Sequence, residues 1–227
     1  MTINYIKDVG FSESKLLLPV FLLLMASFYA CNSKKEAVPQ TVVSEPDEPQ
    51  NTAITLYLQP YNGFPEEQIL KLRADVQNCL DTLIPEQEFA VFWYENEDLP
   101  DYCWYPPRSR YRADSILLYQ LRVNDQNYII GVLNEDISVT SDNIKDWGVL
   151  GFGLQPGTSA VVSTFRVKNK SMFYKVVVHE FLHNLGLDHC PQNDRSCYIC
   201  DADKHPQLEK EVRLCPVCKE YLLSLFE

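Results

Sequence analysis

The sequence predicts a mixed α/β fold, in which a twisted mixed sheet packs against helices and a small cysteine-rich subdomain follows at the C-terminal end. Three observations predict it. Strand-like and helix-like segments alternate from residue 53 onward. A helix late in this alternation carries two of the four histidines, and a third follows it closely. Five of the eight cysteines also follow that helix. Alternation of strands and helices is typical of a layered arrangement, so we expect three layers.

Hydrophobic periodicity identifies the elements of the first half of the domain. Apolar and polar residues alternate over Ala53–Tyr61, which indicates a strand, and apolar residues at helical spacing indicate a helix over Glu66–Leu83. We expect a second strand near Phe89–Tyr94 and then an aromatic, proline-containing loop to about Arg110. A helix near Ala113–Leu121 follows the loop.

The second half continues the alternation as far as the histidines. The run "YIIGVL", Tyr128–Leu133, predicts a buried strand, and two further strands, "VLGFGL" and "TSAVVSTFRV", flank a turn signal at residues 155–157. The next helix is expected over Ser171–Leu185, with the serine as N-cap, and Gly186 can take the positive φ that ends a helix. A last short helix is expected over Pro216–Phe226.

The composition indicates one folded domain rather than a disordered chain. Of the 227 residues, 46% are hydrophobic and 12% are aromatic, which is enough to build one sizeable core. The formal net charge is −11, and no basic stripe interrupts the acidic surface. Such a surface repels phosphate backbones, so nucleic acid is excluded as a partner.

The N-terminal region predicts export. Residues 16–30, "LLLPVFLLLMASFYA", form an uncharged, mainly apolar run that is short for a membrane span and suits a signal peptide over residues 1–30. The "FYAC" junction resembles a bacterial lipobox, which implies cleavage before Cys31 and lipidation of that cysteine. The domain would then be exported and lipid-anchored to a bacterial membrane, on the periplasmic or surface side of the outer membrane. Plain secretion and an uncleaved membrane anchor are the alternatives.

A linker separates this N-terminal segment from the domain. Residues 31–52 are rich in Pro, Glu, Ser and Lys and contain no aromatic residue. This composition cannot build a core and predicts a flexible tether. The folded domain is therefore expected over residues 53–227.

The stretch "HEFLHNLGLDH" predicts a zinc site. His179 and His183 lie four residues apart on one face of a helix, so both imidazoles can reach one ion. The turn at Gly186 lets His189 return as a third ligand. Three protein ligands leave a fourth position for water, which is typical of catalytic zinc, and Glu180 lies beside it as a general base for amide hydrolysis.

The motif resembles the HExxHxxGxxH signature of metzincin zinc proteases. A cysteine directly follows the motif, and this arrangement resembles that of one branch, the archaemetzincins. In that branch a second cysteine and a CxxC pair follow. The upstream segments "YIIGVLNEDIS", "GFGLQPG" and "AVVSTFR" are also similar to the strands before the family's active-site helix. The resemblance covers roughly residues 53–223. It implies a zincin-like fold and a zinc metallopeptidase that acts on peptide or protein substrates. We expect the chain to be a monomer.

The resemblance implies two zinc ions per chain. His179, His183 and His189 would hold the catalytic ion, with Glu180 as the general base. A structural ion would be held in a subdomain that begins near residue 190, by Cys190, Cys197, Cys215 and Cys218. Four thiolates leave no open coordination position, so this second ion would stabilise the subdomain without taking part in the reaction.

The cysteine segment departs from the family pattern at three points. Six residues, rather than four, separate Cys190 from Cys197. Ile199 lies where the family has the methionine of its Met-turn, and it can still supply an apolar floor. The additional Cys200 could replace Cys197 as a ligand.

The residues leave several alternatives open. Oxidising compartments favour disulfides over thiolate zinc sites, so disulfide pairing is the alternative to the second zinc ion. Cys79 and Cys103 could form a disulfide in the first half of the domain. The fourth histidine, His205, is expected in a solvated loop.

The alternatives to a peptidase share the metal site. One is a catalytically inactive, zinc-stabilised binding module on the cell surface, and the other is a zinc amidase that acts on something other than peptide. If the chain is a peptidase, the resemblance implies that the strand near Ser159–Ser163 lines the cleft and pairs with an extended peptide.

Overall fold

The computed structural model describes residues 53–123, 127–141, 144–201 and 208–227. The expected signal peptide, the linker and Cys31 lie outside these residues, and so does His205. Within the described part of the chain, no helix combines the length and the apolar character that crossing a bilayer requires.

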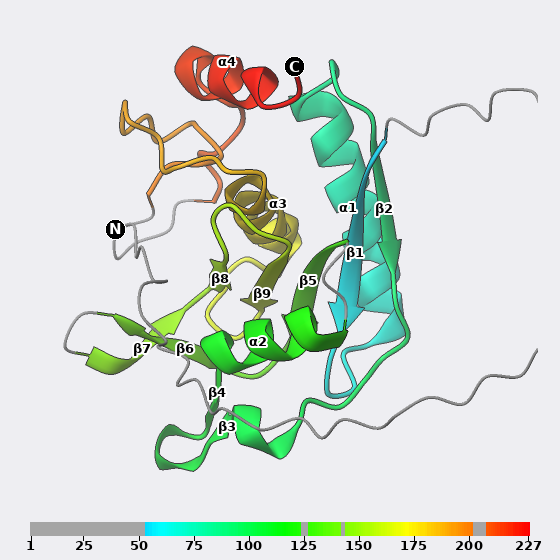
Figure 1. The fold of residues 1–227 in the computed structure, drawn as a ribbon, viewed down its shortest axis with the longest axis vertical. Helices are drawn as coiled ribbons and strands as arrows, with labels where there is room; N and C mark the ends of the chain where they lie inside the picture. Colours follow the sequence, from blue (N-terminus) through cyan, green and yellow to red (C-terminus); the bar gives the residue numbers. More distant parts are fainter. Residues whose placement is uncertain (1–52, 124–126, 142–143, 202–207) are drawn as a thin grey trace, which may run out of the picture. The chain divides into compact units, whose positions relative to one another are not determined.

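The main sheet has five strands in the order β2-β1-β5-β9-β8. Its strands are β1 (Ile54–Pro60), β2 (Phe89–Trp93), β5 (Tyr128–Leu133), β8 (Gly151–Gly153) and β9 (Ser159–Ser163). The first four strands in the sheet order are parallel to one another, while β8 runs antiparallel to β9 and forms one edge of the sheet (Figure 1). The sequence predicted all five, and the strand pair around residues 155–157 is confirmed.

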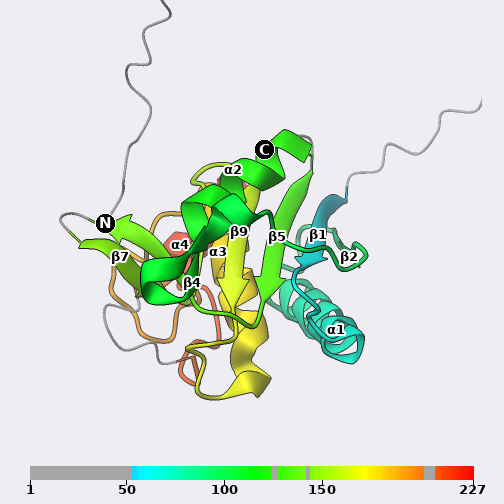
Figure 2. The same cartoon turned by 90° about the horizontal axis from the view of Figure 1, so that it is seen from below.

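Helices cover both faces of this sheet. The helices are α1 (Glu66–Leu83), α2 (Ala113–Val123), α3 (Phe173–Asn184) and α4 (Pro216–Ser224). Figure 2 shows α2 on one face of the sheet and α1 and α3 on the other. The expected three-layer α/β arrangement is therefore confirmed.

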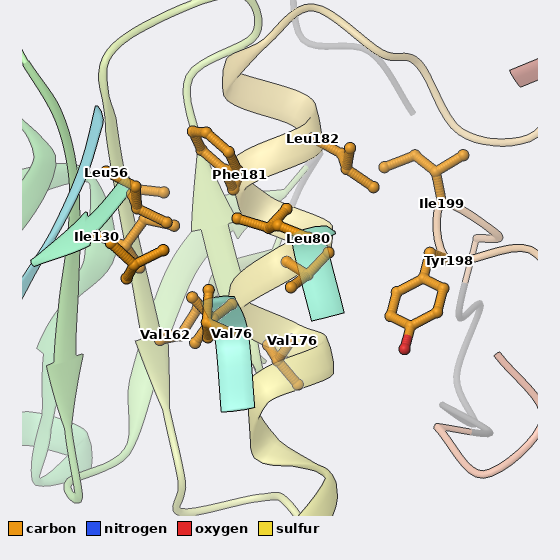
Figure 3. Close-up of a cluster of buried hydrophobic side chains, with 14 of the residues drawn as sticks. Leu56, Val76, Leu80, Ile130, Val162, Val176, Phe181, Leu182, Tyr198 and Ile199 are labelled. Carbon is orange, nitrogen blue, oxygen red and sulfur yellow. The ribbon is translucent and has the colours of Figure 1, made fainter. Parts of the chain in front are cut away.

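The alternation of side chains along β9 divides the core into two clusters. Val162 belongs to the cluster formed with α1 and α3, whereas its neighbour Val161 belongs to the cluster formed with α2. Successive side chains of a strand point to opposite faces, so an apolar run such as "SAVVS" can fill both clusters. Figure 3 shows Val162 in the first cluster with Leu56, Ile130 and Phe181.

A second, four-stranded sheet was missed by the sequence analysis. Its order is β3-β4-β6-β7, and its strands are β3 (Trp104–Tyr105), β4 (Arg110–Arg112), β6 (Ile137–Ser141) and β7 (Ile144–Val149). Two of these strands have only two or three residues, which is too short for a period to be recognised. The expected loop before Arg110 therefore contains part of a sheet, together with two 3-10 turns, η1 (Asp101–Cys103) and η2 (Pro106–Arg108).

The start of α3 also differs from the expectation. A 3-10 turn, η3 (Lys170–Met172), precedes the helix, and the side chain of Asn169 accepts a hydrogen bond from the Ser171 amide. The capping side chain is thus Asn169 and not Ser171. The end of the helix is as predicted, because Gly186 takes a φ of +107° and the chain turns there.

The two cysteines of the first half do not form a disulfide. Both thiols are free. Cys79 packs against the cluster on the α1 and α3 face, while Cys103 belongs to the cluster on the α2 face. The sheet lies between them, so the pairing left open by the sequence is wrong.

Candidate metal centre

Three histidines converge on one point beside α3. His179 and His183 lie on the helix, and His189 returns after the turn at Gly186. The Nε2 atom of His183 lies 3.1 Å from that of His179 and 3.2 Å from that of His189. Two nitrogens at zinc-ligand distance from one tetrahedral ion would be separated by about 3.3 Å. The spacing of these donor atoms therefore fits a zinc ion.

Backbone carbonyls fix the imidazole rings in the orientation that a metal needs. Nδ1 of His179 donates to the Tyr198 carbonyl at 2.8 Å, and Nδ1 of His183 donates to the Leu187 carbonyl at 2.7 Å. Each bond places the ring proton on Nδ1 and leaves the lone pair of Nε2 directed at the common point. Burial lowers the pKa of His179 to about 3 and that of His183 to about 4, so both rings are neutral at physiological pH.

Glu180 is buried between the helix and the edge strand β8. Its side chain packs so closely on Gly151 that a Cβ added there would lie 2.5 Å from Oε1. At Gly153 an added Cβ would lie 3.3 Å from Oε2. Burial raises the pKa of this carboxyl group to about 8. Two glycines of the edge strand thus make the space for the carboxyl group.

Four cysteines form a second cluster in the C-terminal subdomain. The thiols of Cys190, Cys197, Cys215 and Cys218 are buried, and their sulfurs all lie within 4.8 Å of one another. The sulfurs of Cys190 and Cys215 are 3.6 Å apart, close to the roughly 3.8 Å expected for two thiolates on one tetrahedral zinc ion. All seven described cysteines are free thiols, so the described residues contain no disulfide.

Cys200 and Ile199 occupy different places from the four clustered thiols. The Cys200 thiol donates to the Asp201 carbonyl at 3.6 Å and lines the cavity of the histidine centre, so it is not part of the cysteine cluster. Ile199 is fully buried beside Leu182 of α3 (Figure 3). An apolar residue therefore lies beneath the histidine helix, where the sequence led us to expect the floor.

The histidine centre opens into a cavity of about 760 Å³. Three segments line it beside α3: residues 147–151 from the end of β7 to the start of β8, residues 166–169 before the helix, and residues of the cysteine subdomain. The strand β9 was expected to pair with an extended peptide, and this expectation is wrong. β9 is hydrogen-bonded to β5 on one side and to β8 on the other, so the free edge belongs to β8.

Several residues of the site were not recognised from the sequence. Gly151 accommodates Glu180, the Tyr198 carbonyl orients His179, and the buried Lys175 donates to the carbonyls of Leu208 and Glu211, which ties α3 to the cysteine subdomain. Arg166 also lines the cavity. Its segment "AVVSTFR" was noted for its resemblance alone, and nothing in the one-dimensional pattern indicated a role for the arginine.

The fold and the site define a class of protein. A helix bearing HExxH beneath a mixed sheet, followed by a glycine turn and a third histidine, is the architecture of a zinc metallopeptidase. The archaemetzincin of Methanopyrus kandleri is 30% identical over 133 residues, which cover 55% of this chain and 72% of that protein. The chain belongs to the archaemetzincin family, and it is accordingly a zinc metallopeptidase, a hydrolase.

Other comparisons agree with this membership. The archaemetzincin of Haloquadratum walsbyi is 27% identical over 151 residues, covering 60% of this chain and 84% of that protein. The crystal structure of the Methanopyrus kandleri archaemetzincin has the same fold, with a TM-score of 0.65 at 24% identity over 78% of this chain and 97% of that one. The archaemetzincin structure from Archaeoglobus fulgidus, complexed with malonate, gives a TM-score of 0.57 at 26% identity, covering 74% and 99%. No family model matches the chain.

Proposed function

We propose that the chain is a catalytically active zinc peptidase in which His179, His183 and His189 hold the catalytic ion and Glu180 is the general base. The observation that carries the proposal is that the buried Glu180 lines the cavity of the histidine centre, whose three imidazole nitrogens all lie within 4.8 Å of one another. The donor set and its spacing fit zinc. Bound zinc supplies Lewis acidity, which acidifies water and polarises the carbonyl of the scissile bond.

The role of Glu180 follows from its chemistry and its place. As a carboxylate it accepts a proton from the water that attacks the peptide carbonyl carbon, and a new carbon–oxygen bond forms. When the carbon–nitrogen bond breaks, the same carboxyl group delivers the proton to the leaving amine. One water is consumed and one carboxyl and one amine product result, so Glu180 ends in its starting state.

The edge of β8 supports a peptide as the substrate. The Leu150 carbonyl accepts from the Ser163 amide at 2.8 Å, and the Leu154 amide donates to the Ser159 carbonyl at 3.0 Å. In an antiparallel pair, alternate residues bond inward, so the amides and carbonyls of Gly151 and Gly153 point toward the free edge. An extended peptide can add to this edge as a further strand and pass directly over Glu180.

The four clustered thiols support a second, structural zinc ion, held by Cys190, Cys197, Cys215 and Cys218 with Cys200 outside the set. The count of two zinc ions per chain is part of the proposal. We further propose that the domain is exported and lipid-anchored through Cys31, a proposal that rests on the apolar run at residues 16–30 and the "FYAC" junction. Incorporation of a labelled fatty acid tests the anchor, since Cys31→Ser should abolish the label.

Cleavage of a mixed peptide library tests the proposed activity against the inactive binding module. The zinc-loaded chain should cleave peptides, a chelator should stop cleavage, and added zinc should restore it. Cleavage that persists after complete zinc removal would contradict the proposal, and so would a zinc-loaded chain that cleaves no peptide. The intact Glu180 favours activity, because an ion that only stabilises the fold needs no carboxyl group beside it.

A further inference from the structure

An arginine that is held by a buried aspartate lies in the same cavity as the histidine centre. Arg166 follows β9, and its Nε and Nη2 donate to the two carboxylate oxygens of Asp136 at 2.7 and 2.8 Å. The Asp136 side chain is only 7% exposed, whereas 36% of the Arg166 side chain is exposed. The buried partner therefore fixes the guanidinium group while leaving part of it open to the cavity.

The turn that carries Arg166 is also fixed. Thr164 donates through its amide to the Leu133 carbonyl at 3.0 Å and through its hydroxyl to the Asn134 side chain at 2.6 Å. Gly148 packs against the guanidinium group, and a Cβ there would overlap Nη2, Cζ and Nε of the arginine. Because the group is already ordered, binding an anion would cost little conformational entropy.

The guanidinium group retains unused donors. Of its five N–H groups, the Nε proton and one Nη2 proton face Asp136, and no described residue accepts a hydrogen bond from Nη1. The fork formed by Nη1 and Nη2 is the geometry that binds a second carboxylate end-on. Arg110 also contacts Asp136, at 3.1 Å, so two guanidinium groups face one carboxylate.

We propose that Arg166 recognises a carboxylate on the substrate and sets the specificity of the peptidase for it; this inference rests on the proposed function and names its substrate class. Arg166 packs on Gly148, near the end of β7, and Glu180 packs on Gly151, the first residue of β8 and three residues further along the chain. Three residues of chain span at most about 10 Å. The recognised carboxylate therefore lies within about three residues of the scissile bond, as the C-terminal carboxylate of a short peptide or the side chain of Asp or Glu.

Two matched peptide series distinguish these sources, both built on a sequence that the wild-type chain cleaves. One series ends two or three residues beyond the scissile bond as a free acid or as an amide. The other is longer, amidated, and carries Glu or Gln within three residues of the bond on either side. In one series or the other, kcat/KM of the wild-type chain should be about 10- to 100-fold higher for the carboxylate peptide, mainly through KM, because a bidentate charge-assisted pair has that strength.

The variants separate recognition from a purely structural ion pair. Arg166→Ala should remove the preference by lowering kcat/KM for the carboxylate peptide far more than for the uncharged peptide, and Arg166→Lys should retain only a small part of the preference. Gly148→Ala keeps the charge but displaces the guanidinium group, so it should weaken the preference as well. Arg108→Ala is the control, because it removes one cation and the ion pair with Asp146 from outside the cavity.

Three results would overturn the inference. They are equal kcat/KM for both members of both series, a preference that survives in Arg166→Ala, and an equal loss for charged and uncharged peptides in all Arg166 and Gly148 variants. The last result would show that the pair with Asp136 only supports the fold. If the zinc-loaded wild-type chain cleaves no peptide at all, the proposed function fails and this inference fails with it.

Discussion

At Gly151 the backbone of the edge strand touches the Glu180 carboxyl group, and this contact makes a single hydrogen atom important. A methyl group there would lie 2.5 Å from Oε1, so Gly151→Ala should displace the carboxyl group and lower kcat/KM by at least about tenfold, within the range that a general base contributes. Gly153→Ala is the matched control, since its nearest contact is 3.1 Å and the loss should be smaller. Equal activity in both variants at full zinc content would contradict the assigned contact.

The buried Glu211 should make the free energy of unfolding depend on pH. It is 5% exposed, and among the described residues its Oε2 has no hydrogen-bond partner. Burial raises its pKa from 4.5 to about 7, with a smaller opposing effect of Lys175. Because the folded form holds the proton more tightly, the contribution of this group to stability is greatest below pH 4.5 and is lost as the pH rises to about 7.

The test compares the free energy of unfolding in zinc-saturated buffer between pH 5.5 and 8. Glu211→Gln removes the titrating group, so its stability relative to the wild type should rise across this interval. Glu95→Gln, at an exposed position, should show no such trend. A constant difference between Glu211→Gln and the wild type would contradict the assignment.

At the scale of residues, the sequence predicted the three histidines of the metal centre, because their spacing along the chain decides whether they can share one ion. His179 and His183 share a helical face, and the turn at Gly186 returns His189, as the three converging nitrogens require. The partners of these residues could not be predicted in the same way. Every residue has a carbonyl like that of Tyr198, and only the folded chain brings one of them to Nδ1 of His179.

At the scale of elements, long periodic segments were predicted well and short strands were not. The bounds of α1 and β5 agree with the expectation, because eighteen and six residues carry enough of a period to be recognised. β3 and β4 are too short for this, and the assignment of the free edge to β9 failed because strand order in a sheet depends on contacts between distant residues.

The free edge of β8 leads to a prediction about substrates. If the peptide pairs with the outward amides and carbonyls of Gly151 and Gly153, methylation of the peptide nitrogen that bonds to this edge removes one hydrogen bond and adds a clash. A loss of about tenfold or more in kcat/KM is expected. Methylation of the next nitrogen along the peptide is the control, because alternate amides of an extended strand point away. Equal tolerance of both methyl groups would argue against pairing at this edge.

At the scale of the whole molecule, the two clusters of metal-binding groups are joined through the chain. Cys190 directly follows His189, and Cys197 directly precedes Tyr198, whose carbonyl orients His179. The cysteine subdomain also shares the hydrophobic core of the α1 and α3 face through residues such as Ile199. A change at the cysteine cluster should therefore affect the histidine centre as well.

Cys215→Ser tests this coupling. The variant should bind one zinc ion instead of two, unfold at a lower temperature, and lose the remaining ion to a chelator more readily, because ligand removal from a structural site costs folding free energy. Cys103→Ser is the control, since Cys103 lies outside both clusters, on the α2 face of the sheet, and the variant should leave two ions bound. Zinc counts that are equal in Cys215→Ser and the wild type would exclude the cysteine cluster as a metal site.

We propose that Glu180 acts on the reaction and not on the metal, and Glu180→Gln tests this role most directly when zinc content and peptide cleavage are measured on the same sample. The amide has nearly the size of the carboxyl group but cannot take up a proton from water. The account predicts a full zinc complement and a loss of kcat of about 10²- to 10⁴-fold. Cleavage close to the wild-type rate in the zinc-loaded variant would contradict it.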